Sequence, residues 1–267
     1  MAEIVEFGPE TQQTLAVGDR VCSIPFIKQG DELNNIGITP VVPGAYAEYL
    51  LLTEELLVPV PENLSDEAAA LAEPLAVGVH AVAKSNINEE ECALVIGCGP
   101  IGLATIAALK MQGVEKIIVA DYSAKRREIA SLMGASLAIN PSEQSPYEAL
   151  ASIQPEGHVV FECVGRSGML SQIIEQVPKH TRIIAAGLSQ GEDSFMPVTA
   201  LIKELQIQFV IYYSPEEFSQ ALQALADGHV DWQHWVSSKV NLEGVANAFV
   251  SLQDPEQETK ILIEPWS

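Results

Sequence analysis

The fold is decided by the stretch 93–112, ALVIGCGPIGLATIAALKMQ. A continuous apolar run that ends in G-x-G-x-x-G is typical of a buried parallel strand that turns sharply into a helix. In that pattern Gly97 permits the tight turn, Gly99 lets the backbone approach a pyrophosphate, and Gly102 lets helix and strand pack closely. The helix predicted from about Pro100 would point its free N–H groups and positive dipole end at the phosphates.

The sequence beyond this helix agrees with a dinucleotide site. After Gly113 a second apolar strand is predicted at 116–120, and it ends in Asp121, 19 residues beyond Gly102. A carboxylate at about this spacing binds the adenosine ribose diol. Asp121 would also repel a 2′-phosphate, so the sequence favours NAD over NADP. Arg126 is interpreted either as a surface arginine or as a cofactor contact, over the adenine or at the diol.

Length and composition are those of a globular protein. The 267 residues suggest two domains or one large one, and 48% apolar residues suffice for a core. With 36 acids against 14 bases the formal charge is −22, which repels nucleic acid and anionic membranes. No stretch resembles a signal peptide or a membrane span. We therefore expect a soluble, cytoplasmic protein whose partner is a small-molecule substrate.

The cysteines show no metal-binding pattern. Cys22, Cys92, Cys98 and Cys163 form no C-x-x-C pair, which argues for buried, reduced thiols and against a structural zinc site. Cys98 lies in the glycine turn and Cys163 at a predicted strand end, so both are expected near the cofactor without a role in the chemistry. No histidine pairs with a second ligand at metal spacing, and no metal is assigned to the histidines.

From Cys92 onward strands and helices alternate strictly. The predicted strands are 92–96, 116–120, 137–139, 158–164 and 182–186, with 207–211 considered as a sixth. The predicted helices between them are 100–112, 124–133, 146–152 and 169–176. This alternation predicts an α/β fold with a doubly wound parallel sheet of Rossmann type, covered by helices on both faces.

The residues before this unit are predicted to be mainly β structure. The expected elements are strands at 4–7, 18–21 and 44–52, a loop at 27–42, a helix at 67–72 interrupted by 73–75, and a helix from Ala76 to before Asn86. The tail carries a helix from Pro215 to Gly228, a helix at 242–252 and a strand at 259–263. We expect this last strand to return to the first domain, so that residues 1–76 and 213–267 form one domain and 77–212 the other.

Several motifs occur together along almost the whole chain. They are VGDRV at 17–21, PGAYAEY at 43–49, the stretch 69–82 with EPL at 73–75, the glycine turn, ECVG at 162–165 and the tail 215–265. As a set they resemble the medium-chain dehydrogenase/reductase family, in its zinc-type alcohol and polyol (sorbitol- or threonine-dehydrogenase-like) branch. The resemblance implies a GroES-like catalytic domain split by the cofactor domain, an active site in the cleft between them, and a homodimer or homotetramer.

The resemblance also implies roles for particular residues. Ile101 takes a cofactor position with Asp121 and Arg126, the segment 186–188 would line the nicotinamide, and the loop 210–212 would close over it. Polyol dehydrogenases often have an arginine where Tyr212 stands. The predicted cofactor-binding residues are Gly97, Gly99, Pro100, Ile101, Gly102, Asp121, Arg126, Cys163, Val164, Gly187, Leu188 and Val210.

The sequence departs from the family at both zinc sites. The family's structural-zinc lobe should fall between Val21 and Tyr46, and this loop has no cysteine after Cys22. The usual first ligands of the catalytic zinc, a cysteine and a Gly-His-Glu unit, belong upstream of the strand at 4–7, so the GroES-like domain is expected to be truncated. Only Glu73 stands at a family position in or next to the metal's first shell. Zinc is thus expected from the family, but no ligand set is predicted here.

Three functions follow as hypotheses. The first is an NAD(P)-dependent dehydrogenase that transfers hydride between an alcohol, polyol or ketone and nicotinamide. The second is a zinc-free enzyme on the same scaffold, an enone reductase or a redox-neutral catalyst, with Glu73, Tyr46 or Tyr212 supplying the proton. The third is a nucleotide-binding module without turnover.

Overall fold

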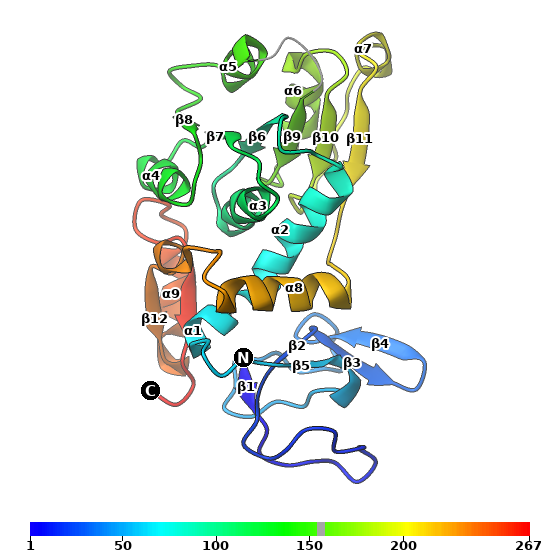
Figure 1. Ribbon diagram of the computed structural model, residues 1–267, viewed down its shortest axis with the longest axis vertical. Coiled ribbons are helices and arrows are strands. Elements are labelled where there is room, and N and C mark those ends of the chain that lie inside the picture. The colour runs from blue at the N-terminus through cyan, green and yellow to red at the C-terminus, as the bar shows by residue number, and fades with distance from the viewer. Residues whose placement is uncertain (154–157) are drawn as a thin grey trace.

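The computed structural model describes residues 1–153 and 158–267, and its centre is a parallel sheet (Figure 1). The strands of this sheet are β6 (Cys92–Ile96), β7 (Lys116–Ala120), β8 (Leu137–Ile139), β9 (Val159–Glu162), β10 (Arg182–Ala185) and β11 (Gln206–Phe209). Their order is β11-β10-β9-β6-β7-β8, and every neighbouring pair is parallel. The predicted Rossmann-type sheet is confirmed, including its sixth strand.

Helices cover both faces of the sheet, as predicted. Ala93 and Val95 of β6 point into one core, shared with α2 (Ala72–Ser85), α3 (Pro100–Met111) and α8 (Pro215–Ala226). Leu94 of the same strand points into a second core, shared with α5 (Pro146–Ile153) and α6 (Met169–Gln176). Two further helices complete this part of the chain, α4 (Ala124–Leu132) and α7 (Pro197–Ile202), the second of which the sequence analysis missed.

Helix α2 is continuous where the sequence analysis predicted a break. Pro74 lies in its first turn, where backbone N–H groups have no partner within the helix, so proline is tolerated there. The break lies instead at Ala70 and Leu71, after the short α1 (Asp66–Ala69). Gly78 sets a close crossing of α2 on α3, since a Cβ built there would lie 2.5 Å from the carbonyl carbon and oxygen of Ala104. The predicted domain boundary at 76/77 falls inside α2.

The N-terminal part forms two small antiparallel sheets (Figure 1, blue). One has the order β1-β2-β5, with β1 (Ala2–Glu3), β2 (Arg20–Ser23) and β5 (Leu57–Pro59), and η1 (Glu54–Leu56) precedes β5. The other is the hairpin β3 (Phe26–Gln29) and β4 (Glu32–Asn35).

Three predictions in this part are wrong. The first strand lies at 2–3 rather than 4–7, and the chain leaves the sheet after Ile4, whose N–H still donates to the Asp19 carbonyl. The predicted loop 27–42 contains the hairpin, whose turn is Gly30-Asp31 with Gly30 at φ +63°. The predicted strand 44–52 has no strand partner in the described residues, and its side chains are largely exposed. An apolar pattern becomes a strand only where another strand accepts its hydrogen bonds.

The tail begins with the predicted helix. Ser214 and Glu217 form a complete capping box at the start of α8. The remaining elements are η2 (Trp232–His234), β12 (Ser238–Val240), η3 (Leu242–Gly244), α9 (Val245–Ser251) and β13 (Ile261–Ile263). The last strand, β13, pairs in parallel with β12 of the same tail and does not extend the sheet β1-β2-β5. Among the described residues no helix has the length and apolar character to span a membrane.

Candidate functional site

The glycine turn has the geometry that its sequence predicts. Gly97 follows β6 with φ +90°, a conformation that favours glycine. A Cβ built at Gly102 would lie 1.8 Å from the Gly97 carbonyl oxygen, so this position accepts no side chain. None of the described residues comes within 4 Å of a Cβ built at Gly99. The turn therefore packs tightly at its first and third glycines and is open at its second.

The open glycine lies at the start of helix α3. Gly99 is the N-cap, Pro100 is the first helical residue, and no side chain caps this end. Ile101 and Gly102 follow in the first turn, where backbone N–H groups are available to an anion. The turn lies between the ends of β6 and β9, where the strand order changes direction, which is where α/β sheets bind ligands.

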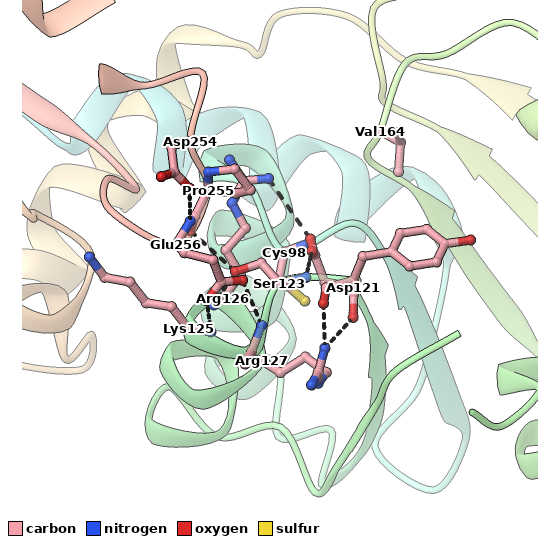
Figure 2. A network of polar contacts seen from close by, with 12 residues as sticks. Cys98, Asp121, Ser123, Lys125, Arg126, Arg127, Val164, Asp254, Pro255 and Glu256 are labelled. Atoms are coloured by element: carbon pink, nitrogen blue, oxygen red, sulfur yellow. Dashed lines mark hydrogen bonds and ion pairs between the residues drawn. The ribbon is translucent and has the colours of Figure 1, made fainter. Parts of the chain in front are cut away.

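Asp121 faces this turn from the end of β7 (Figure 2). Its Oδ2 accepts a hydrogen bond from the Cys98 N–H at 2.8 Å, and its Oδ1 accepts one from the Ser123 N–H at 2.8 Å. Arg126 Nη1 lies 4.0 Å from Oδ2, and the Asp121 side chain is only 11% exposed. The arrangement holds a largely buried carboxylate beside the glycine turn.

The ends of β9 and β10 supply the other wall. A Cβ at Gly97 would lie 2.7 Å from Val164 Cγ2 and 3.3 Å from the Cys163 carbonyl carbon, so these residues lie against the turn. The buried Glu162 shapes this loop, because its Oε1 accepts from the N–H groups of Val164 at 2.7 Å and Gly165 at 2.8 Å.

The predicted nicotinamide segment lies next to this wall. A Cβ at Gly187 would lie 2.3 Å from the Gly165 nitrogen, Leu188 after it is exposed, and the Val210 N–H donates to the Ala185 carbonyl at 3.1 Å. The structure therefore brings the predicted cofactor residues to one edge of the sheet. Glu162 was noted in the sequence only as part of a motif, and its positioning role becomes visible in the fold.

The two cysteines beside this edge are held as thiols. Burial raises the pKa of Cys98 far above its usual range, and the Asp121 charge acts in the same direction. Burial raises the pKa of Cys163 to about 12, although the hydrogen bond between its thiol and the Thr105 hydroxyl acts in the opposite direction. Since the thiolate is the nucleophile and metal ligand, neither residue is suited to that chemistry at neutral pH.

The predicted proton donors do not gather in one place. Glu73 is bonded by Tyr213, whose hydroxyl donates to Oε1 at 3.3 Å. Tyr212 instead donates to Asn35 Oδ1 at 3.3 Å and packs edge-on against Phe26. Tyr46 is 60% exposed. Glu73 therefore contacts Tyr213 rather than the predicted Tyr212, which is the next residue before it in the sequence.

Lys260 completes the surroundings of Glu73. Burial lowers the pKa of Lys260, while the Glu73 charge raises it. Burial raises the pKa of Glu73, while the Lys260 charge and the Tyr213 hydroxyl act in the opposite direction. Neither Tyr213 nor Lys260 carries a local sequence signal for this role, because they lie 140 and 187 positions from Glu73 and meet it only in the fold.

The residues around Glu73 do not fit a catalytic zinc. Such a site needs about three protein ligands and an open position. Among residues 1–153 and 158–267 no group of three or more His, Cys, Asp or Glu side chains could hold a metal ion. Near Glu73 the structure has an ammonium group and a phenol, which do not bind a cation in their ordinary protonation states. These residues are therefore arranged for proton transfer or charge pairing rather than for binding a metal ion.

Glu73 should make the stability of the protein depend on pH in an unusual direction. The pKa of Glu73 in the folded protein lies above its unfolded value. Its contribution to the free energy of unfolding is therefore fully present at low pH and is lost as pH rises through the folded pKa. The free energy of unfolding of Glu73→Gln relative to wild type should therefore increase from about pH 4 to pH 7. Urea unfolding at several pH values measures this slope.

Glu67→Gln is the control of opposite sign. A hydrogen bond from Lys239 lowers the pKa of Glu67, so wild type gains stability relative to this variant as pH rises. Equal slopes for the two variants would contradict the assignment of a buried, poorly solvated carboxylate at Glu73.

Comparison with known proteins agrees with this fold. Residues 100–227 match the family described as zinc-binding dehydrogenase. The chain is 31% identical to sorbitol dehydrogenase from Bacillus subtilis over 279 aligned residues, 98% of this chain and 78% of that protein. It superposes on the crystal structure of 2R,3R-butanediol dehydrogenase from Bacillus subtilis with a TM-score of 0.87 and 30% identity, again over 98% of this chain and 78% of the other. The chain belongs to the zinc-type medium-chain dehydrogenase/reductase family.

Structures with bound cofactor are among the similar ones. A zinc-binding dehydrogenase from Sinorhizobium meliloti 1021, solved with NADP, has a TM-score of 0.86 and 26% identity over 98% of this chain and 81% of its own. An alcohol dehydrogenase from Escherichia coli CFT073, solved with NADH, has a TM-score of 0.87 at 23% identity, with the same two coverages, a likeness of fold. Nicotinamide cofactors with and without a phosphate on the adenosine 2′-oxygen therefore both occur on this fold.

Proposed function

We propose that this chain binds NAD(H) at the carboxyl ends of β6, β7 and β9 and transfers hydride between an alcohol or polyol and the nicotinamide. The observation that carries the proposal is the turn at Gly97, Gly99 and Gly102, tight at two glycines and open at the one where a pyrophosphate would approach. The names of the relatives favour a vicinal diol or a sugar alcohol as substrate, with the matching ketone in the reverse direction.

The preference for NAD rests on Asp121. Its Oδ2 accepts from the turn at Cys98 and its Oδ1 from the Ser123 N–H, and a carboxylate there accepts hydrogen bonds from ribose hydroxyls but repels a 2′-phosphate. When bound, the cofactor supplies the redox chemistry. The chain's own residues hold the adenosine at Asp121, orient the dinucleotide along the turn, and line the nicotinamide end with Val164 and the segment 187–188.

A zinc-free reduction of an activated double bond is the second candidate, and the cluster of Glu73, Tyr213 and Lys260 favours it. In this cluster the carboxyl, ammonium and phenol groups lie together in a poorly solvated part of the protein, and none of them needs a metal to carry a proton. Hydride from the reduced cofactor would add to one carbon of the double bond, and a proton supplied through Tyr213 would add to the other. The cofactor leaves oxidised, and solvent restores the proton.

One set of measurements tests these proposals. NADH fluorescence titration should give saturable binding, and assays with NAD and vicinal diols or sorbitol should give NADH. Oxidation of vicinal diols or sorbitol with NAD supports the first proposal. Turnover of enones by metal-free protein supports the second. Binding without turnover across alcohols, ketones and enones leaves a nucleotide-binding module, and the absence of NADH binding overturns all three.

We also propose a homodimer formed at the edge strand β11. The segment 195–211 carries one base and one acid in a chain of net charge −22, so two copies can approach there with little repulsion. In this segment Leu201 is 74% exposed and Phe209 is 68% exposed. A second copy would cover them and pair with the open edge of β11.

Leu201→Asp tests this interface. Light scattering should give twice the chain mass of 28.8 kDa for wild type and the single mass for the variant, because an unpaired charge would be buried between the copies. Val17→Asp, at an exposed apolar residue in the N-terminal turn region, should leave the mass unchanged. A wild-type monomer, or a variant that stays dimeric, would rule the edge-strand interface out.

A further inference from the structure

The N-terminus of helix α4 has all of its first donors occupied by acceptors of the chain itself (Figure 2). The Ser123 N–H donates to Asp121 Oδ1, and the Arg126 N–H donates to Ser123 Oγ at 3.1 Å. The Ala124 and Lys125 N–H groups donate to Glu256, at 2.9 Å to Oε1 and 3.3 Å to Oε2. Two carboxylates therefore face the helix end that follows β7.

Glu256 comes from the C-terminal segment, 132 positions beyond Ala124. Several contacts hold it in place. The Pro255 carbonyl accepts from Ser123 Oγ at 3.2 Å, the Gln257 carbonyl accepts from Lys125 Nζ, and the Glu256 N–H donates to Asp254 Oδ1 at 3.0 Å. The neighbouring Ser123 side chain lowers the pKa of Glu256, and the backbone N–H groups of Lys125 and Ala124 add to this, so the carboxylate is ionised at neutral pH.

Two of the three cations of α4, Lys125 and Arg127, bond to backbone carbonyls. Arg127 Nη1 donates to the carbonyls of Asp121 and Tyr122, both at 2.8 Å. Lys125 is bonded to the C-terminal segment, whereas Arg126 lies 4.0 Å from Asp121 and its buried Nε has no hydrogen-bond partner among the described residues. A phosphate needs free N–H groups or cationic side chains, and at this end of the helix it would meet two carboxylates beside the guanidinium of Arg126.

We propose that Glu256 is a specificity-determining residue that rejects cofactors phosphorylated on the adenosine 2′-oxygen. The inference rests on the proposed function, because it requires the ribose to lie at Asp121. The 2′-oxygen of a ribose held there lies beside the loop 122–123 and the start of α4, where a 2′-phosphate would meet the Glu256 carboxylate. Half of the selectivity for NAD thus comes from the C-terminal segment, outside the nucleotide-binding unit.

The test is titration of the full chain with NADH and with NADPH. Wild type should bind NADPH at least ~100-fold more weakly than NADH, since two carboxylates oppose the phosphate. Glu256→Gln keeps the shape and removes one charge, so NADPH affinity should rise about tenfold while NADH affinity changes by less than about threefold. Glu256→Lys should raise NADPH affinity further. Glu256→Asp keeps the negative charge and should bind NADPH as weakly as wild type does.

Two controls separate this effect from others. Glu148→Gln removes an equal charge from the exposed side of α5 and should leave the NADPH to NADH ratio unchanged. Thermal unfolding of each variant shows whether the hydrogen bonds from the first N–H groups of α4 to Glu256 are needed for folding. If Glu256→Gln unfolds, the cofactor affinities of Glu256→Lys and Glu256→Asp are compared instead. An unchanged ratio in folded Glu256→Gln and Glu256→Lys overturns the inference while leaving the site intact. Failure of wild type to bind NADH overturns the proposed function instead.

Discussion

Gly102→Ala should unfold or severely destabilise the protein, while Gly99→Ala, three positions earlier, should leave it folded. At Gly102 the new methyl group would lie 1.8 Å from the Gly97 carbonyl oxygen, so the turn and helix α3 must move apart. Overpacking against a rigid backbone of this kind costs ~3 kcal/mol or more. For a chain of this size we expect the melting temperature to fall by about 6–12 °C or more.

Gly99→Ala should affect cofactor binding without affecting the stability of the fold. Its backbone, at φ −71° and ψ −174°, suits alanine, and no described residue lies within 4 Å of the added Cβ. The methyl group would occupy the side from which a pyrophosphate approaches, so NADH affinity should fall roughly 100-fold, about 2.7 kcal/mol, with the melting temperature nearly unchanged. Thermal unfolding and fluorescence titration measure both. A folded Gly99→Ala that binds NADH as wild type does would show that no diphosphate rests on this turn.

The second large effect is expected at Asp121. In Asp121→Asn the ribose hydroxyls lose a charged acceptor, and hydrogen bonds to charged groups contribute ~1.5–3 kcal/mol each. NADH affinity should therefore fall by one to two orders of magnitude, roughly 10- to 100-fold. The variant should lose some stability as well, because the Cys98 and Ser123 N–H groups share this carboxylate.

Glu128→Gln is the matched control for this substitution. It removes one charge from the exposed side of α4, the helix that follows Asp121, and should change neither binding nor stability appreciably. Equal NADH affinity in wild type and folded Asp121→Asn would contradict the placement of the adenosine ribose.

Part of the fold could be predicted from the sequence because the signals for it are local. The strands at 92–96 and 116–120 are where the apolar runs predicted them, and the fully buried β6 explains why its run is continuous rather than alternating. Helix α8 begins with the capping box that Ser214 and Glu217 indicate. Each of these signals lies within a few residues of the element it specifies.

Much of the N-terminal part and of the tail could not be predicted because the signals there depend on distant partners. The segment 44–52 has a strand-like pattern, yet Tyr46 packs on Phe249 and Tyr49 on Trp266, about two hundred positions along the chain. The hairpin β3–β4 did carry a local signal, the Gly30-Asp31 turn, which the polar character of the surrounding loop obscured. The pairing of β13 with β12 and the contact of Tyr213 with Glu73 arise only in the folded chain.

The close crossing at Gly78 has a consequence for motion. Because the backbones of α2 and α3 touch there, neither helix can slide or rotate past the other without a collision at Ala104. Glu73 at the start of α2 and the glycine turn at the start of α3 therefore travel as one rigid block. Any opening or closing over a bound molecule must be carried by the loops that join this block to its neighbours, such as the segment that leads from β11 to Ser214.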